Sequence, residues 1–124
     1  MSQTFGKVIR QARKDKGYSQ RELAKLIGVD YTYLSKLEND HAGYPPKAEV
    51  IRLLALHLNL TEREEELSYL AGRITEDDAK VFEEFVKSNS KVMPALFRKM
   101  RDNPDFAQKF IRETTQPESE DKQS

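Results

Sequence analysis

Residues 19–39 read SQRELAKLIGVDYTYLSKLEN and contain the signals for two helix starts and one tight turn. Ser19 and Glu22 are three residues apart, which is the spacing of a capping box at the start of a helix. Gly28 supplies the permissive backbone that a tight turn needs, and Asp30 is a typical N-cap for a second helix. The stretch therefore predicts two short helices joined by a tight turn. The residues expected to lock the second helix across the first are Leu23, Ile27, Val29, Leu34 and Leu37, with the small Ala24 at the crossing.

The second predicted helix begins with a run of polar side chains. Tyr31, Thr32 and Tyr33 stand in its first turn, and Ser35 and Lys36 follow. Side chains of this kind donate or accept hydrogen bonds, yet the chain offers them no evident internal partner. The sequence therefore raises the question of what this helix binds.

Helical patterns also lie before and after this pair. Apolar residues at helical spacing predict a helix over 5–16. The segment 47–60, KAEVIRLLALHLNL, predicts a fourth helix, and Thr61 is expected to cap a fifth helix over 61–73. Acidic residues fill the first turn of that last helix, where the helix dipole favours them. Together these patterns predict five helices by about Gly72.

The stretch SQRELAKLIGVDYTYLSKLEN, with one helix before it and two after it, resembles the lambda repressor/Cro-like family of bacterial and phage regulators, often called the XRE family. The resemblance extends over residues 5–72. It implies an all-α fold, in which a five-helix lambda-repressor-like DNA-binding domain precedes a short helical C-terminal extension. It also implies that the third helix lies in the major groove of double-stranded DNA, because residues at the start of such a helix point at base edges. The partners of the polar run then lie outside the protein.

The resemblance assigns DNA contacts to the start of the third helix and to the residues that flank it. Thr32 can donate or accept a hydrogen bond, and its methyl group can meet a thymine methyl. Tyr31 and Tyr33 can touch bases or phosphates, but each can equally face solvent or pack. Gln20 opens the second helix, where it can meet a phosphate or simply cap the helix. The residues expected to contact DNA are Ser19, Gln20, Tyr31, Thr32, Tyr33, Ser35, Lys36, Asn39 and Lys47.

Four residues near the predicted DNA contacts are expected to have a structural role or one of two roles. Arg13 and Glu38 match positions that form a structural ion pair in relatives, so both are expected to serve the fold and not DNA. His41 is expected to be a loop residue rather than a base reader. Lys47 can clamp the sugar–phosphate backbone or only aid solubility.

The predicted recognition helix departs from the family in one respect. Its first turn has no Gln, Asn or Arg, the side chains that read adenine or guanine through two hydrogen bonds. This departure indicates a large share for backbone contacts and DNA shape in recognition. It also leaves the operator sequence open.

The remainder of the chain predicts a helical extension. Its apolar stripes lie on helices too short to be stable alone in water, so they must pack on one another, on the first domain or on another chain. We therefore expect a DNA-binding domain over 1–73, a dimerisation or regulatory extension over 74–113 and a disordered tail over 114–124. The residues assigned to a dimer interface, with core packing as the alternative, are Phe82, Phe85, Met93, Leu96, Phe97, Met100, Phe106 and Phe110.

Composition limits the other functions of the chain. Of its 124 residues 37% are hydrophobic and 34% are charged. There is no cysteine and only two histidines, so we expect no metal site, no cofactor and no enzymatic activity. Residues 1–60 hold ten Lys and Arg against six Asp and Glu, whereas residues 61–124 hold eleven against fifteen. This split indicates a polyanion-binding first half.

The location and the function follow as expectations. No apolar run approaches membrane-spanning length and no signal peptide is evident, so we expect a cytoplasmic, nucleoid-associated protein of a prokaryote or a phage without a membrane partner. We expect a sequence-specific transcriptional regulator, a repressor, that binds a two-fold symmetric operator as a homodimer. Half-sites about one helical turn apart, roughly 34 Å, are typical of such dimers. The alternative is an antitoxin or a protease-inactivated repressor whose C-terminal helices bind a protein partner, either a toxin or a peptidase.

Overall fold

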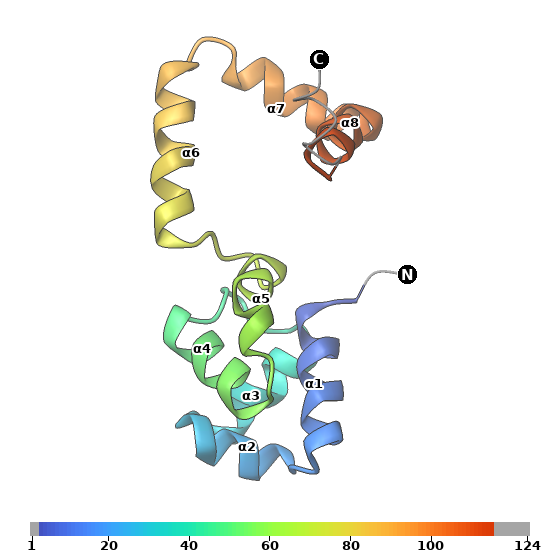
Figure 1. The fold of residues 1–124 in the computed structure, drawn as a ribbon, viewed down its shortest axis with the longest axis vertical. Helices are drawn as coiled ribbons and strands as arrows, with labels where there is room; N and C mark the ends of the chain where they lie inside the picture. The colour runs from blue at the N-terminus through green and yellow to red at the C-terminus, as the bar shows by residue number, and fades with distance from the viewer. Residues whose placement is uncertain (1–2, 116–124) are drawn as a thin grey trace, which may run out of the picture. The chain divides into compact units, whose positions relative to one another are not determined.

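The computed structural model describes residues 3–115 of the 124-residue chain, and every regular element in that range is a helix. The chain divides into two compact units, Met1–Ala79 and Lys80–Ser124 (Figure 1). The predicted all-α fold is confirmed. The domain boundary predicted at residue 73 falls shortly before the division between the units.

The first unit is built around one core. Its helices are α1 (Phe5–Lys16), α2 (Gln20–Ile27), α3 (Tyr31–Glu38), α4 (Ala48–His57), the 3-10 helix η1 (Thr61–Arg63) and α5 (Glu64–Leu70), with the first turn of α6 (Glu76–Ser88) at its end. Figure 1 shows α1 to α5 packed around a common centre. The buried apolar side chains there are Phe5, Val8, Ile9, Leu23, Ala24, Ile27, Leu34, Leu37, Ile51, Leu54, Ala55, Leu58 and Leu67. Each of the larger ones stabilises the fold by roughly 1.5–3 kcal/mol.

The start of α2 has the predicted capping box. Glu22 N donates to Ser19 Oγ at 3.0 Å, and Ser19 N donates to Glu22 Oε1 at 2.8 Å. The hydrogen bond from the Ser19 backbone, with a smaller contribution from its side chain, lowers the pKa of Glu22 below the ordinary value. Gly28 ends α2 with a left-handed φ of 73°, which allows the tight turn. Asp30 occupies the predicted N-cap position of α3, although its side chain accepts no capping hydrogen bond.

Two boundaries in the second half of this unit differ from the prediction. The helix predicted over 47–60 ends earlier, at His57, because Asn59 adopts a left-handed φ of 61°. Thr61 opens η1 instead of capping an α-helix, and α5 begins at Glu64. The glutamates of the first turn of α5 still lie where the helix dipole favours them.

A hydrogen-bonded clamp ties the start of α1 to the end of α3. The carboxylate of Asp40 accepts from the Thr4 hydroxyl at 2.6 Å and from the Gly6 N–H at 2.9 Å. Asp40 has a left-handed φ of 57°, a conformation that Asp tolerates better than most residues. The two helices approach so closely that a Cβ on Gly6 would lie 2.5 Å from the Leu37 carbonyl oxygen and 2.6 Å from that of Glu38. Only glycine fits at this crossing without a shift of the backbone.

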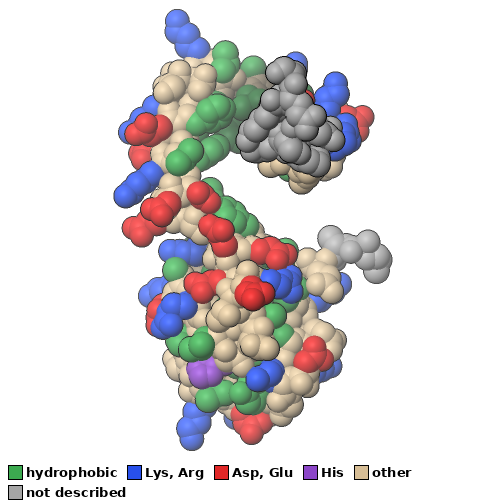
Figure 2. Space-filling view, viewed as in Figure 1, with side chains coloured by type: hydrophobic (Ala, Val, Ile, Leu, Met, Phe, Trp, Pro, Cys, Tyr) green, Lys and Arg blue, Asp and Glu red, His purple; other side chains and the backbone are tan. Residues whose placement is uncertain are grey.

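The second unit contains most of α6, together with α7 (Met93–Asp102) and α8 (Pro104–Thr115). Among residues 80–115, Met93 is the one apolar side chain that is fully buried. Figure 2 shows the hydrophobic side chains of α6 gathered along one side of the helix, with charged side chains on the other. The tail predicted over 114–124 starts within the last turn of α8, and residues 116–124 lie outside the described residues.

Candidate nucleic-acid interface

The start of α3 presents polar side chains to solvent. Tyr31, Thr32 and Lys36 are exposed, and Ser35 is half-buried. Within residues 3–115, the side chains of Tyr31, Thr32 and Lys36 form no hydrogen bond or ion pair. Leu34 and Leu37 on the opposite face are buried in the core, which fixes the helix in place. The first turn of α3 is therefore a rigidly held surface with free hydrogen-bonding groups.

Tyr33 turns back towards the core. Its side chain is half-buried and packs against the apolar cluster of the first unit. This burial raises the pKa of the Tyr33 phenol above its ordinary value. Of the two predicted tyrosine contacts, Tyr31 is thus the more accessible to a ligand, and Tyr33 contributes mainly to packing.

A buried carboxylate network joins α1, α2 and α3. The Glu38 side chain is 0% exposed and accepts from Arg13 Nε at 2.7 Å and from Arg13 Nη2 at 3.1 Å. It also accepts from Gln20 Nε2 at 2.9 Å, while Arg13 Nη1 donates to the Tyr18 carbonyl oxygen at 2.9 Å. A buried carboxylate is tolerated only when charged and polar partners satisfy it in this way. Arg13 and Glu38 therefore lie together inside the fold, away from the exposed start of α3.

This network determines which groups of Gln20 remain available to a ligand. The side-chain amide donates one N–H to Glu38, which holds it towards the buried network. The backbone N–H groups of Gln20 and Arg21 form no hydrogen bond within the described residues, as expected for the first turn of a helix. Such N–H groups attract anions, so the start of α2 offers a phosphate its backbone rather than the Gln20 amide.

Asn39 is engaged inside the domain at both ends of its side chain. Its Nδ2 donates to the Ser35 carbonyl oxygen at 2.9 Å, and its Oδ1 accepts from Arg10 Nη2 at 2.6 Å. These bonds hold the C-terminal end of α3, so a DNA contact by Asn39 stays a prediction beside this structural role. Lys47 lies exposed before α4, and His41 lies exposed in the loop after α3, as expected.

The sequence interpretation missed one residue at this surface, Arg21. Its guanidinium carbon lies 4.3 Å from the centroid of the Tyr31 ring, so the second residue of α2 stacks on the first residue of α3. The sequence carries no signal for this contact, because it depends on how α2 and α3 cross. The pair joins the exposed beginnings of both helices.

Two further features, a metal-ion cluster and a membrane span, were sought in the described residues. No group of three or more His, Cys, Asp or Glu in residues 3–115 could hold a metal ion. Over the same residues, no helix has the length and apolar character to span a membrane.

Comparisons with known proteins place the first unit in a family. A family model described as "Helix-turn-helix" matches residues 9–64. The "ImmF control region 10 kDa protein" of Bacillus phage phi105 is 38% identical over 56 residues, which cover 45% of this chain and 60% of that protein. The "HTH-type transcriptional regulator SinR" of Bacillus licheniformis is 37% identical over 66 residues, or 49% of this chain and 60% of that protein. SinR of Bacillus subtilis (strain 168) is 36% identical over the same shares of both chains.

A solved structure titled "SINR PROTEIN/SINI PROTEIN COMPLEX" aligns with 86% of this chain and 99% of its own, at 24% identity and a TM-score of 0.45. The curated relatives are each matched over about 60% of their length. The region that the family model matches holds α2, the tight turn and α3. Residues 9–64 of this chain are therefore similar to a helix-turn-helix domain, and this similarity bears out the resemblance to the XRE family, the lambda repressor/Cro-like regulators.

Proposed function

We propose that the protein is a sequence-specific DNA-binding repressor of transcription that places the start of α3 in the major groove. The observation that carries this proposal is the exposed pair Tyr31 and Thr32 at the start of α3, whose side chains form no hydrogen bond within residues 3–115 and whose helix is held by the core that α2 shares. The match of residues 9–64 to the helix-turn-helix family supports it. The relatives named as a transcriptional regulator and as a control-region protein support the regulatory role.

Different parts of this surface contact different parts of the DNA. Thr32 and Tyr31 meet base edges, because residues at the start of a recognition helix lie deepest in the groove. The backbone N–H groups that begin α2, next to Ser19, hold a phosphate and set the register of the protein on the duplex. Lys36 and Lys47, both exposed, add attraction to the sugar–phosphate backbone, and this attraction weakens as salt rises.

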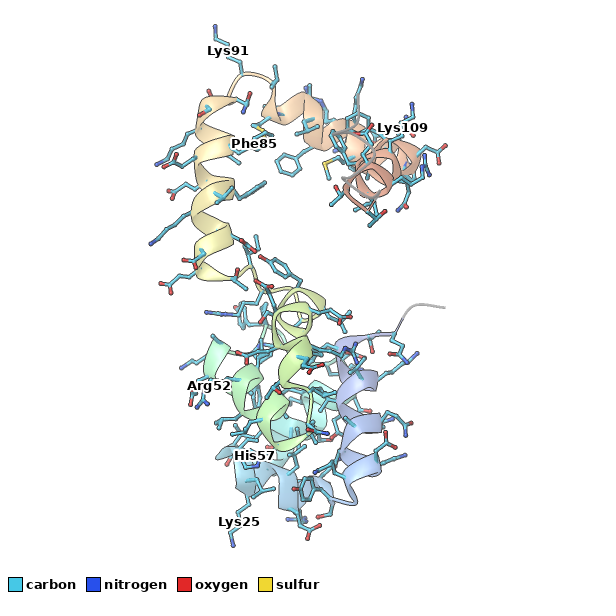
Figure 3. All side chains as sticks on the ribbon, viewed as in Figure 1. Lys25, Arg52, His57, Phe85, Lys91 and Lys109 are labelled. Atoms are coloured by element: carbon cyan, nitrogen blue, oxygen red, sulfur yellow. The ribbon has the colours of Figure 1, made fainter. Side chains whose placement is uncertain are left out.

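We also propose that the protein binds a two-fold symmetric operator as a homodimer. The second unit supplies the subunit contact, because it exposes apolar side chains such as Phe85 (47%) and Phe110 (54%). Figure 3 shows Phe85 projecting from α6 on the side where α7 lies. Met93 is 5% exposed and is therefore removed from the predicted interface. The residues that remain in the proposed interface are Phe82, Phe85, Leu96, Phe97, Met100, Phe106 and Phe110.

The regulator acts without a metal ion, a cofactor or a reaction of its own, and it works in the cytoplasm on the nucleoid. DNA binding of this kind needs positioned side chains and no bond rearrangement. Its repressing effect then follows from occupancy of the operator.

The test is selection of binding sites by the full chain from a pool of random double-stranded DNA. The selected DNAs should share a two-fold symmetric motif. Thr32→Ala should weaken binding to that motif roughly tenfold or more while changing binding to unrelated DNA far less. Thr61→Ala, at another exposed threonine of the first unit, is the control and should bind as the wild type does. A pool that yields no shared motif would overturn the proposal.

A further inference from the structure

Arg21 is held by an aromatic ring rather than by a carboxylate. Its guanidinium lies 4.3 Å from the centroid of Tyr31, and no ion pair or side-chain hydrogen bond to Arg21 occurs within residues 3–115. Arg13 and Arg52, by contrast, each donate to a carboxylate, of Glu38 and Glu49 respectively. The stacking restrains the side chain without using its hydrogen bonds.

The edge of a stacked guanidinium keeps its hydrogen-bonding capacity. A guanidinium that lies flat over a ring is attracted through its face, so the N–H donors around its rim stay free. These donors form a planar fork whose spacing matches two acceptors side by side. Guanine presents such a pair, O6 and N7, in the major groove, and Arg contacts to this pair are the commonest specific ones.

The Arg21–Tyr31 pair supplies a purine-reading side chain, which the first turn of α3 lacks. The first turn of α3 carries hydroxyls but no Arg, Gln or Asn that could read a purine through two hydrogen bonds. Arg21 belongs to α2, but its stacking on Tyr31 places its guanidinium beside the first residue of α3. That end of a recognition helix faces base edges, whereas the free N–H groups at the start of α2 suit a phosphate.

We propose that Arg21, positioned by the ring of Tyr31, reads a guanine in each half-site of the operator. This inference rests on the proposed function, because it needs the start of α3 to lie in the major groove. Arg21 is then the specificity-determining residue for one base pair, and Tyr31 is the platform that orients it. The hydroxyls of α3 read the neighbouring positions.

The experiment measures the affinity of the full chain for the selected operator and for copies in which each guanine in turn is replaced by 7-deazaguanine. This base lacks the N7 acceptor but keeps Watson–Crick pairing. For the wild type, one guanine per half-site should be sensitive, with affinity falling about tenfold. In Arg21→Ala that sensitivity should disappear, and in Arg21→Lys it should shrink, because an ammonium has no planar fork.

Two variants of the platform separate the ring from its hydroxyl. Tyr31→Phe keeps the ring, so the sensitivity at that guanine should persist even if affinity falls elsewhere. Tyr31→Leu removes the ring and should weaken the sensitivity at the same position. Circular dichroism and thermal unfolding check that each variant is folded, which is expected because both side chains are exposed.

Lys25→Ala is the matched control for charge. Lys25 lies on the same helix and projects from the surface of the domain (Figure 3). Its removal should leave the selected motif and the 7-deazaguanine profile unchanged.

Different failures have different meanings. If Arg21→Ala weakens binding to every DNA equally, with an unchanged profile and a shallower salt dependence, Arg21 contacts a phosphate and this inference is overturned while the proposed function stands. If wild-type protein selects no motif at all, the proposed function fails and the inference fails with it.

Discussion

The two units of the chain use their apolar residues in opposite ways. In the first unit, side chains such as Ile9 and Leu54 are 0% exposed. In the second, Phe85 and Phe110 are 47% and 54% exposed although aromatic pairs form within the unit. An apolar side chain stabilises a fold only as far as it leaves water. The first unit therefore carries its own stability, whereas the second has apolar surface available for association.

Both units carry ion pairs on the surface, but among the described residues only the first contains a buried one. In the first unit Glu38 is buried and fully paired, and no buried side-chain nitrogen or oxygen in the part of the chain that the structure describes lacks a partner. In the second unit, ion pairs such as Lys87–Glu83 lie on the surface, where they contribute little. Interior substitutions in the first unit therefore test folding, whereas surface substitutions in the second test association.

The largest effect is expected for Glu38→Ala. The substitution leaves the guanidinium of Arg13 without its carboxylate in a mostly buried position, so the free energy of unfolding should fall by about 3–5 kcal/mol. Urea unfolding of the full chain, followed by circular dichroism, measures it. Glu38→Gln keeps the shape and some hydrogen bonds and should cost less. A loss below about 1 kcal/mol for Glu38→Ala would mean that the first unit does not depend on its interior network.

Leu54→Ala and Phe85→Ala compare the two kinds of apolar residue directly. Leu54 is 0% exposed, so its truncation leaves a cavity and should lower the free energy of unfolding by about 2–5 kcal/mol at every protein concentration. Phe85 is 47% exposed, so its truncation should cost about 1 kcal/mol or less at high dilution. Its main effect should be weaker self-association in sedimentation experiments. Equal, concentration-independent losses would contradict the contrast between the units.

Gly6→Ala tests the close crossing of α1 and α3. The added methyl group would meet two carbonyl oxygens at 2.5 and 2.6 Å, so the helices must move apart, at a cost of about 1–3 kcal/mol in the free energy of unfolding. Gly43→Ala is the control, because a Cβ there would have no neighbour within 4 Å and the backbone has no left-handed φ. If both substitutions have the same effect in urea unfolding, the crossing is looser than the structure indicates.

The smallest effect concerns Tyr33 at alkaline pH. Burial raises its pKa above the ordinary value of about 10, so the folded state holds the phenol proton more tightly than the unfolded state does. The contribution of this proton to stability is complete below about pH 10 and is lost as the pH rises through the folded-state pKa. Stability above about pH 10 should therefore fall less steeply in Tyr33→Phe than in the wild type. Tyr44→Phe, at a ring 87% exposed, should follow the wild type.

Features decided by neighbours in the sequence could be predicted. The capping box of α2 joins residues three apart, and the bounds of α1 and α2 follow from local periodicity and glycine. Thr61 shows the limit of the local approach. A capping residue followed by acidic residues predicts an α-helix start, but the chain forms a 3-10 turn there, and α5 begins only at Glu64.

The contacts of the candidate interface depend on how helices cross, and the sequence alone could not supply them. Gln20 meets Glu38 across 18 residues, and Arg10 meets Asn39 across 29. Both contacts are hydrogen bonds within the protein, and they occupy the side chains of Gln20 and Asn39, which the sequence predicted to contact DNA. The stacking of Arg21 on Tyr31 likewise requires the angle between α2 and α3, which no periodicity encodes.

The clamp at Asp40 has a practical consequence for handling this protein. Because Asp40 bonds Thr4 and Gly6, 36 and 34 residues earlier, the chain from Thr4 to Asp40 forms a closed ring that contains α3. A purification tag fused directly before Thr4 would disturb the hydrogen bonds from Thr4 and Gly6 to Asp40, which hold the end of α3. Such a tag should change DNA affinity without altering any residue of α3, and a flexible Gly/Ser spacer should restore it. Thr4, directly before α1, thus helps to hold the end of α3 in place.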